Sequence, residues 1–582
     1  MTVNILFFTI WSCLCQQNST EAPLSSLFIE YLKKDVDLQP FLGTRLGDHR
    51  HADRLESLSI PAQHKRIDHH QTTLKKLLIL RDSSNLNLDD KVDLDTWINH
   101  EKRWLWNDRV IQPLYRDPRI YSEYISDSTL LLITQTTLPR DRIVQACLGR
   151  TREIPRIVEE AKTNLSSSRV PKPARVFVET AIRQNLGSMA WYRTGMLNLL
   201  HSQNNSGELK TACDLATKSL ESYHKFLTDE LLPVSTGDWR LGTALYDEKL
   251  AYDLESPLIR TAIRHEADKE FTHVTKTMEA LSKNLWTQVI KNQPMPKEGT
   301  DPRLVIAPVL KAASSDRGTV DSLVNDARTA ATDLKAFIRQ RNLLDLPEPD
   351  RCDIVEMPEF QRGNSVAYLN NAPPLDINAR SVYAISPPPA DWNSRRVNSF
   401  LDEYNRRMMR ILTLHEAYPG HYVQLEYGNR HPSIIRKVLS SGVYIEGWAV
   451  HMEQVMLDEG FAKGDPLLRL LQLKWYLRAV ANAILDQGMH CEQWTDEKAL
   501  RFLVDDAFQS EGEAFGKITR AKQSSCQLST YFVGRTAMHE LRKATEARLG
   551  GKFNLKTYHH AVLGVGAVPV KHLDVLIHAA LP

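Results

Sequence analysis

The segment from His415 to His421, with the sequence HEAYPGH, places two imidazoles and one carboxylate close together in the chain. A catalytic zinc ion takes three protein ligands, typically histidine nitrogens and carboxylate oxygens, and keeps one position open. In the familiar motif HExxH, both histidines lie on one face of a helix, four residues apart. Here the separation is six residues, which is a net turn of about 240° and would point the two rings apart on a regular helix.

Pro419 and Gly420 lie inside this spacing and offer a way to correct it. Proline removes a backbone donor and collides with the preceding turn, whereas glycine accepts dihedral angles that other residues avoid. We therefore predict a helix that breaks at Tyr418–Gly420, so that His421 turns back towards His415.

The third ligand is expected from a second helix, predicted over Ser440–Leu457. Glu446 lies there between apolar residues, and a carboxylate in such surroundings needs a cation or strong hydrogen bonds. We interpret His415, His421 and Glu446 as ligands of one Zn²⁺ ion. Glu453 lies seven residues further on the same helical face and could orient a histidine ligand by a hydrogen bond. The alternative for Glu453 is a salt bridge at the surface.

Glu416 follows the first ligand and so points to a different side of the helix. That position suits a general base acting on water that a metal has acidified. A transition state at a carbonyl also needs a donor for its oxyanion. Four downstream residues qualify by type, and spacing alone does not choose among them: His490, Tyr531, His559 and His560.

The elements that must position these groups are predicted to be mainly helical. Apolar residues recur at three- and four-residue spacing over Leu88–Trp106, Arg142–Leu165, Pro173–Leu186, Leu209–Leu231 and Ile259–Ile290. A similar stripe runs from a cap at Asn393 or Ser394 to His415 and predicts one helix there. The periodicity predicts a large, mainly helical body. The hypothesis of a catalytic zinc site adds the expectation that this body is metallopeptidase-like and has a deep cleft.

A proline-rich change of composition between Leu344 and Pro389 predicts a small sheet or extended arm before the metal-binding helix. Val366–Leu369 and Ser381–Ile385 are short and rich in β-branched and aromatic residues, which favours strands. Tyr383–Ser386 could offer a free edge to a peptide substrate, and a plain connecting strand is the alternative.

The composition of the whole chain narrows its class. The 582 residues carry a net charge near +2, so no basic field indicates a nucleic-acid partner. No apolar run is long enough for a transmembrane segment. Apart from two cysteines in the leader, five cysteines stand far apart without a CxxC pair, which argues against disulfides and against a cysteine metal site.

Residues 1–22 are predicted to form a signal peptide or a disordered leader, because an apolar run precedes a polar one. Export, whether periplasmic, secreted or lipid-anchored, is favoured over a cytoplasmic location, although no basic residue precedes the apolar run. Residues 23–343 form the predicted N-terminal helical region, and residues 344–582 form the catalytic metal-binding region of the same continuous fold.

Several motifs together resemble a bacterial family known as domain of unknown function 885, whose members look like gluzincin-type metallopeptidase relatives. They are HEAYPGH at 415–421, YIEGWA at 444–449, DQGMH at 486–490 and QxxTYxxG at 527–534. The resemblance implies that His415, His421 and Glu446 hold zinc and that Glu416 is the base. It also implies Tyr531 as phenolic donor and His490 as a second donor. The sequence departs from the family at Ser525-Cys526, where Pro-Gly is usual, and at Thr530 and His560.

Three hypotheses follow. The first is a zinc-dependent peptidase, in which Glu416 activates water and Tyr531 or His490 stabilises the oxyanion. The second is an amidase or esterase that applies the same chemistry to a small non-peptide substrate. The third is a helical binding protein with a vestigial metal site; Glu416 argues against it, because a structural zinc site does not need a base.

Overall fold

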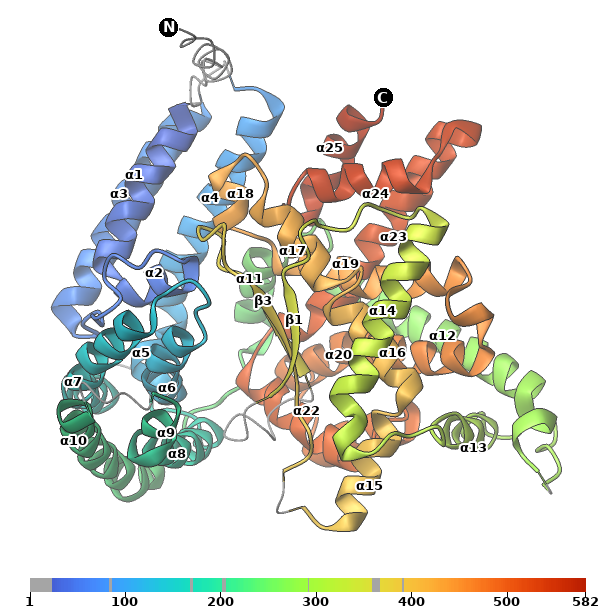
Figure 1. The fold of residues 1–582 in the computed structure, drawn as a ribbon, viewed down its shortest axis with the longest axis horizontal. Coiled ribbons are helices and arrows are strands. Elements are labelled where there is room, and N and C mark those ends of the chain that lie inside the picture. Colours follow the sequence, from blue (N-terminus) through green and yellow to red (C-terminus); the bar gives the residue numbers. More distant parts are fainter. Residues whose placement is uncertain are drawn as a thin grey trace, which may run out of the picture.

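A computed structural model describes residues 23–82, 86–167, 171–200, 206–291, 293–357, 367–389 and 392–582. The predicted leader, residues 1–22, lies outside the described residues. The chain is mainly helical with one small sheet, as the sequence predicts. Helices α1 to α10 form one side of the molecule, and the later elements form the other (Figure 1).

The first side contains ten α-helices and two π-helical turns. They are α1 (Pro23–Leu38), α2 (Pro40–Leu46), α3 (Ile60–Arg81), α4 (Leu88–Trp106), η1 (Asn107–Ile111), α5 (Pro113–Arg116), α6 (Arg119–Ile133), α7 (Arg140–Leu165), α8 (Arg175–Ala190), η2 (Trp191–Gly195), α9 (Met196–Leu200) and α10 (Ser206–Lys225). Four of the five predicted helices fall within this part or its extension η3 (Phe226–Leu231), and the fifth is α12. The apolar periodicity that predicts these helices depends on residues close together in the sequence, so it can be recognised without knowing the tertiary contacts.

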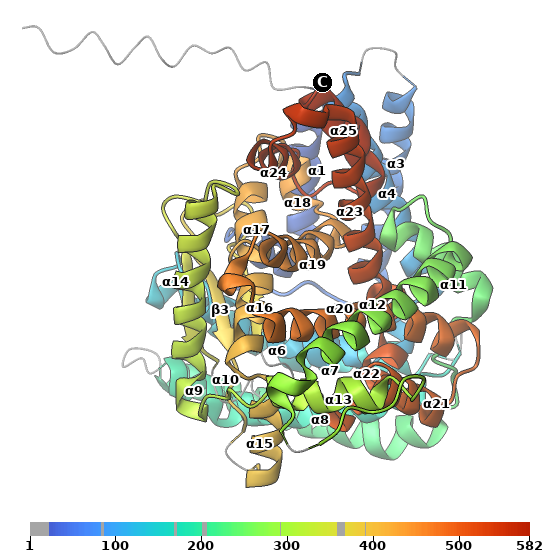
Figure 2. The same ribbon diagram turned by 90° about the vertical axis from the view of Figure 1, so that its right-hand side faces the viewer.

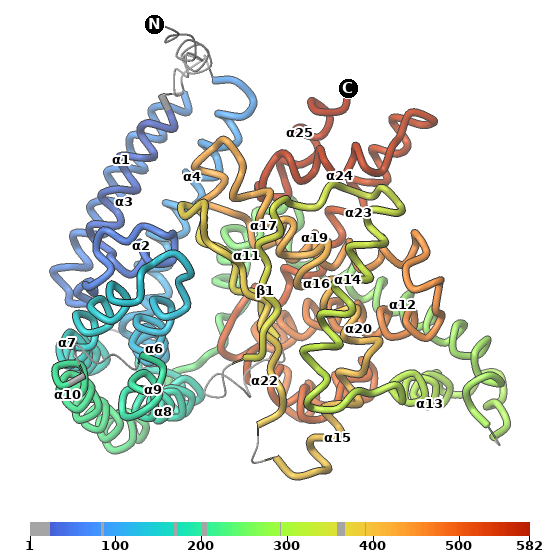
Figure 3. The backbone as a smooth tube through the Cα atoms, in the orientation of Figure 1, coloured from blue at the N-terminus to red at the C-terminus, as the bar shows by residue number. Residues whose placement is uncertain are grey.

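The second side continues from green to red in the tube drawing (Figure 3). Before the sheet it contains η4 (Leu232–Val234), α11 (Gly242–Leu254), α12 (Arg260–Val289), α13 (Arg303–Ala313), η5 (Val320–Ser322) and α14 (Leu323–Arg341). After the sheet come α15 (Ser394–Glu403), α16 (Arg406–Glu416), α17 (His421–Asn429), α18 (Ile434–Val438), α19 (Gly442–Asp458), η7 (Phe461–Gly464), α20 (Pro466–Cys491), α21 (Asp496–Arg501) and η8 (Phe502–Asp506). The chain ends with α22 (Glu511–Gln523), η9 (Gln527–Ser529), α23 (Thr530–Leu549), η10 (Gly550–Lys552), α24 (Leu555–Gly564), η11 (Val570–His572) and α25 (Leu573–Ala580).

The sheet has three strands in the order β1-β3-β2: β1 (Cys352–Glu356), β2 (Ala367–Asn370) and β3 (Ser381–Ile385). The strands predicted at β2 and β3 are confirmed, and β1 was not predicted. β3 pairs in parallel with β1 and antiparallel with β2. The hypothesis of a free edge at Tyr383–Ser386 is therefore wrong, because β3 is the central strand and both of its sides are paired.

The single helix predicted from Asn393 to His415 is divided into α15 and α16. Asn393 caps α15 as predicted, with its side chain accepting from the N–H of Arg396. The chain then leaves the helix near Tyr404, and the buried side chain of Asn405 accepts from two backbone N–H groups at the start of α16. Asparagine is a strong helix cap, so Asn405 begins a new helix at this point. The apolar periodicity continues through both helices and therefore does not reveal the interruption.

Among the described residues, buried apolar side chains form three clusters. The largest extends from Val92 to Ile577 and surrounds α12, α16, α19, α20 and α23. A second lies among α2 and α6 to α10, and a third joins α1, α3 and α4 to Ile435 of α18. Figure 2 shows α19 and α20 near the centre of the second side, with α23 running alongside. No helix in the described part of the chain is long and apolar enough to cross a membrane.

Candidate metal centre

The chain leaves the helical path between α16 and α17, at the position that Pro419-Gly420 predicts. α16 ends at Glu416, Ala417 has φ −124° and ψ −75°, and α17 begins at His421. The N–H groups of Ala417 and Tyr418 both donate to the carbonyl of Thr413, at 2.9 and 3.2 Å. The predicted break is confirmed.

Two features stabilise this turn: a glycine where no side chain fits, and a hydrogen bond from α19. A Cβ atom on Gly420 would collide with the carbonyl oxygens of Leu414 and His415, so only glycine lets the turn fold against the end of α16. From α19, the indole N–H of Trp448 donates to the carbonyl of Pro419 at 2.8 Å. The turn is thus tied to the helix that carries Glu446. The sequence analysis did not assign a role to Trp448. Its position two residues after Glu446 could have indicated that it lies near the candidate ligands.

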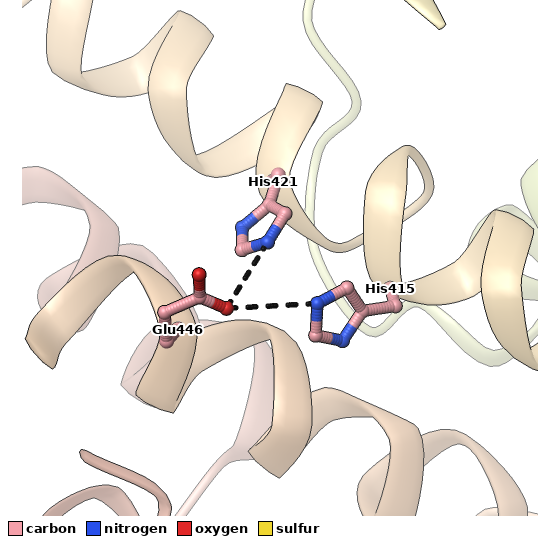
Figure 4. Close-up of side chains that lie close together, drawn as sticks. All are labelled: His415, His421 and Glu446. Atoms are coloured by element: carbon pink, nitrogen blue, oxygen red, sulfur yellow. Dashed lines mark ion pairs between the residues drawn. The ribbon is translucent and has the colours of Figure 1, made fainter. Parts of the chain in front are cut away.

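Three side chains from three helices converge beside the turn (Figure 4). Nε2 of His415 and Nε2 of His421 lie 3.7 and 3.5 Å from the same Oε2 atom of Glu446. The two imidazole rings are 4.6 Å apart and nearly perpendicular. Within the described residues, this is the one group of three or more potential ligand side chains close enough to share a metal ion. The structure therefore brings together the three residues selected from the sequence.

The donor set and its spacing fit zinc. Two atoms that bind one zinc ion at tetrahedral angles lie about 3.4 Å apart, close to the separations of Glu446 Oε2 from the two imidazole nitrogens. That oxygen is buried and has no hydrogen-bond partner in the described part of the chain. A buried carboxylate oxygen in this position is costly unless a cation faces it. The Glu446 side chain keeps 22% of its exposure, so one side of the cluster stays open.

Electrostatics in the cluster favour positive charge next to Glu446. Burial raises the pKa of Glu446, but the two histidines outweigh it and hold that pKa well below its usual range. Burial lowers the pKa of His415, but the attraction of the Glu446 and Glu453 carboxylates outweighs it, and the pKa lies well above its usual value. Both directions describe an ionised carboxylate that attracts a cation, either a proton on an imidazole or a metal ion.

Glu453 orients the first histidine. Its Oε1 atom lies 2.8 Å from Nδ1 of His415, and the Glu453 side chain is completely buried. A carboxylate in this place fixes the ring orientation and leaves Nε2 free to face Glu446. The predicted hydrogen bond is confirmed, and the alternative of a surface salt bridge for Glu453 is wrong.

Glu416 is the last residue of α16 and is partly exposed. In the described part of the chain, we find no hydrogen bond or ion pair of its carboxylate. Because consecutive helical residues are about 100° apart, Glu416 faces a different direction from His415. The carboxylate is thus adjacent to the cluster but is not part of it.

Tyr531 lies in the first turn of α23, close in sequence to the point where α23 crosses α19. The two helices are so close at Gly447 and Gly534 that a Cβ atom on either would collide with the backbone of the other. Glu446 precedes Gly447, and Tyr531 lies one helical turn before Gly534. The Tyr531 hydroxyl accepts a hydrogen bond from Arg520 at 3.2 Å, a contact that the sequence did not reveal.

His490 is not brought into the cluster. Its Nε2 atom donates to the carbonyl of Ala521 at 2.8 Å, and its Nδ1 atom accepts from the N–H of Leu241 at 3.4 Å. The backbone thus engages both ring nitrogens, which leaves none to donate to a substrate. This geometry does not agree with the expected role of His490 as a second donor.

His559 and Tyr383 contact residues that hold the turn in place, namely Trp448 and Thr413. The Nδ1–H group of the fully buried His559 donates to the carbonyl of Leu343 at 2.9 Å, and the His559 ring contacts Trp448 edge to face. The hydroxyl of Tyr383, also fully buried, lies 3.3 Å from Oγ1 of Thr413. Both side chains support groups that shape the turn and are not themselves among the converging side chains.

Comparisons with known proteins agree on the fold. The family described as "Bacterial protein of unknown function (DUF885)" matches residues 40–577. A solved structure of a candidate lipoprotein of unknown function from Shewanella oneidensis has a TM-score of 0.81 and 26% identity, and the match covers 96% of this chain and 100% of that one. A candidate lipoprotein from Colwellia psychrerythraea has a TM-score of 0.80 and 17% identity, with 96% and 98% covered, and so shows similarity of fold. Among curated proteins, no match was found.

Proposed function

We propose that this chain, which belongs to the bacterial DUF885 family of unknown function, is a zinc-dependent hydrolase that cleaves peptide bonds. The convergence of His415, His421 and Glu446 carries the proposal, because Glu446 presents a buried, unbonded oxygen to two imidazole nitrogens. A structural site would use four protein ligands, whereas three ligands and a partly exposed side fit a catalytic one.

The chemistry that zinc supplies at such a site is Lewis acidity, which lowers the pKa of a water molecule and polarises a carbonyl group. Glu416 accepts the proton of the attacking water, since its carboxylate is adjacent to the ligands and unengaged. Tyr531 donates a hydrogen bond to the oxygen that gains negative charge. Glu453 keeps His415 in the orientation that ligation requires.

The arrangement supports a gluzincin-like relationship. Two histidines from an interrupted helix and a glutamate from a following helix replace the ligands of the regular motif, and a glutamate beside the first histidine acts as base. We place the substrate in a cleft between the helical halves, on the partly exposed side of Glu446. An amidase or esterase would use the same groups, so the substrate screen below decides between these classes.

Export is part of the proposal. The apolar run within residues 1–22 has the character of a leader. The two similar solved structures are both described as candidate lipoproteins. Cys13, one of the two cysteines in the leader, is the candidate for lipid attachment. Membrane fractionation of the native host tests this: the wild-type protein should be found with the membranes, and Cys13→Ser should release it.

Metal analysis and one substitution test the catalytic proposal. The purified protein should contain about one zinc ion per chain, and chelation should abolish cleavage of a peptide library read by mass spectrometry. Glu416→Gln should retain zinc and reduce turnover at least about a hundredfold, because it removes only the base. Glu540→Gln, which alters a surface glutamate paired with Lys543, is the control and should retain full activity.

A protein without affinity for zinc would refute the catalytic proposal. Cleavage of ester or small amide substrates, with every peptide left intact, would retain the zinc chemistry and reject the peptidase assignment.

A further inference from the structure

Helix α22 carries two cationic side chains without a carboxylate partner. Neither Lys517 nor Arg520 has a carboxylate oxygen within ion-pair distance in the described part of the chain. Lys517 is only 6% exposed, whereas Arg520 is exposed. The two lie three residues apart on one face of the helix. Other cations of the helix differ: Lys522, for example, pairs with Asp496 at 2.6 Å.

The surroundings of Lys517 do not compensate for its burial. The neighbouring carboxylate, Glu513, accepts from Arg478 at 2.8 Å and from the Tyr404 hydroxyl at 3.3 Å through Oε1. Its buried Oε2 atom has no hydrogen-bond partner in the described part of the chain, and it lies beyond ion-pair distance of Lys517. Burial, followed by repulsion from Arg478, lowers the pKa of Lys517 well below its usual value despite the attraction of Glu513. A buried ammonium group with no anion of its own destabilises the fold. A bound anion would remove that cost.

Arg520 connects this pair to the candidate metal centre. One guanidinium nitrogen donates to the Tyr531 hydroxyl at 3.2 Å and to the side-chain oxygen of Gln527 at 2.7 Å. Tyr531 in turn lies one turn from Gly534, where α23 meets α19 beside Glu446. Arg520 thus touches the residue to which we assign the oxyanion, and its remaining donors are free for a ligand.

We propose, on the basis of the zinc hydrolase function above, that Lys517 and Arg520 form a subsite for a substrate carboxylate. A guanidinium and an ammonium group on adjacent turns match the two oxygens of a carboxylate. The subsite adjoins Tyr531, so the recognised carboxylate lies close to the scissile bond. The substrates are short peptides with a free C-terminal carboxylate, which makes the enzyme a carboxypeptidase or dipeptidase.

Binding of benzoylglycine and of its amide tests the subsite without catalysis. In isothermal titration of the zinc-loaded protein, the acid should bind at least about tenfold more tightly than the amide, the effect of one charge-assisted contact. Lys517→Met and Arg520→Gln should each remove this difference, whereas Lys522→Met should preserve it. Lys517→Met should also melt no lower than wild type, because methionine fills the same space without a buried charge.

Equal binding of acid and amide, or a preference that survives both substitutions, would overturn the subsite. Peptides with a free or amidated C-terminus separate this result from failure of the enzyme. If the wild type cleaves both equally, the subsite is rejected and the hydrolase stands; if it cleaves neither, the hydrolase fails and the titration still decides the subsite. Rapid cleavage of amidated peptides only when they carry aspartate near the end supports the subsite and assigns it to a side-chain carboxylate.

Discussion

Glu453 is the residue that most directly orients His415 in the candidate metal centre. It is fully buried, and its contact with Nδ1 of His415 directs the other ring nitrogen towards Glu446. Glu453→Gln retains the shape of the side chain but weakens this hydrogen bond. We expect a loss of about 10- to 100-fold in zinc affinity, the typical effect of removing a partner of a histidine ligand.

Competition with a fluorescent chelator measures this change. Glu459→Gln is the matched control, because Glu459 stands at the end of the same helix and pairs with Arg341 at the surface. Equal zinc affinity in wild type and Glu453→Gln would mean that the turn alone orients His415.

At the scale of elements, the interruption between α16 and α17 lets two histidines six residues apart face the same oxygen of Glu446. Gly420→Ala would place a methyl group against the carbonyl oxygens of Leu414 and His415. Relief of that collision must move either the end of α16 or the start of α17. We expect destabilisation of about 1–3 kcal/mol, which is typical of overpacking, together with the loss of bound zinc.

Gly428→Ala provides the comparison for this prediction, since a Cβ atom there meets only the end of the Gln424 side chain. Thermal melting and zinc content of both variants give the result. Retention of zinc by Gly420→Ala at the wild-type level would show that the turn tolerates a side chain and would remove the glycine from the explanation.

Local sequence patterns predicted the helices and strands better than the contacts between them. Pro419-Gly420 located the helix break, and the apolar surroundings of Glu446 identified it as a candidate ligand, because both signals lie within a few residues of the site. The central position of β3 was not predicted, since it depends on pairing with β1, whose sequence between prolines carries little periodicity. His490 was misjudged for a similar reason: the carbonyl of Ala521 that engages its ring comes from another helix. Lys517 and Arg520 share one helical face, but only the structure reveals that neither is paired.

For the whole molecule, the N-terminal helices must be held against the half that carries the candidate metal centre. Arg436 of α18 performs part of this task from a position that is only 3% exposed. Its guanidinium donates to Asp93 at 2.5 Å and to Asp89 at 2.7 Å, both in α4, and to the carbonyl of Val565 beyond α24 at 3.0 Å. One side chain therefore connects three segments that are far apart in the sequence.

Arg436→Met tests how strongly this connection stabilises the molecule. The substitution retains apolar contacts of the side chain but leaves the buried Asp93, among the described residues, with the hydroxyl of Ser433 as its one remaining hydrogen-bond donor. Removing one member of a buried ion pair costs about 3–5 kcal/mol, so we expect a clearly lower melting temperature and faster hydrogen exchange in α1, α3 and α4. Arg317→Met, which breaks the surface pair with Asp402, should cost at most about 1 kcal/mol. Because α18 leads directly into α19, lower zinc occupancy in Arg436→Met would indicate that docking of the N-terminal helices helps to position Glu446. Unchanged occupancy together with a lower melting temperature would confine Arg436 to holding the two sides together.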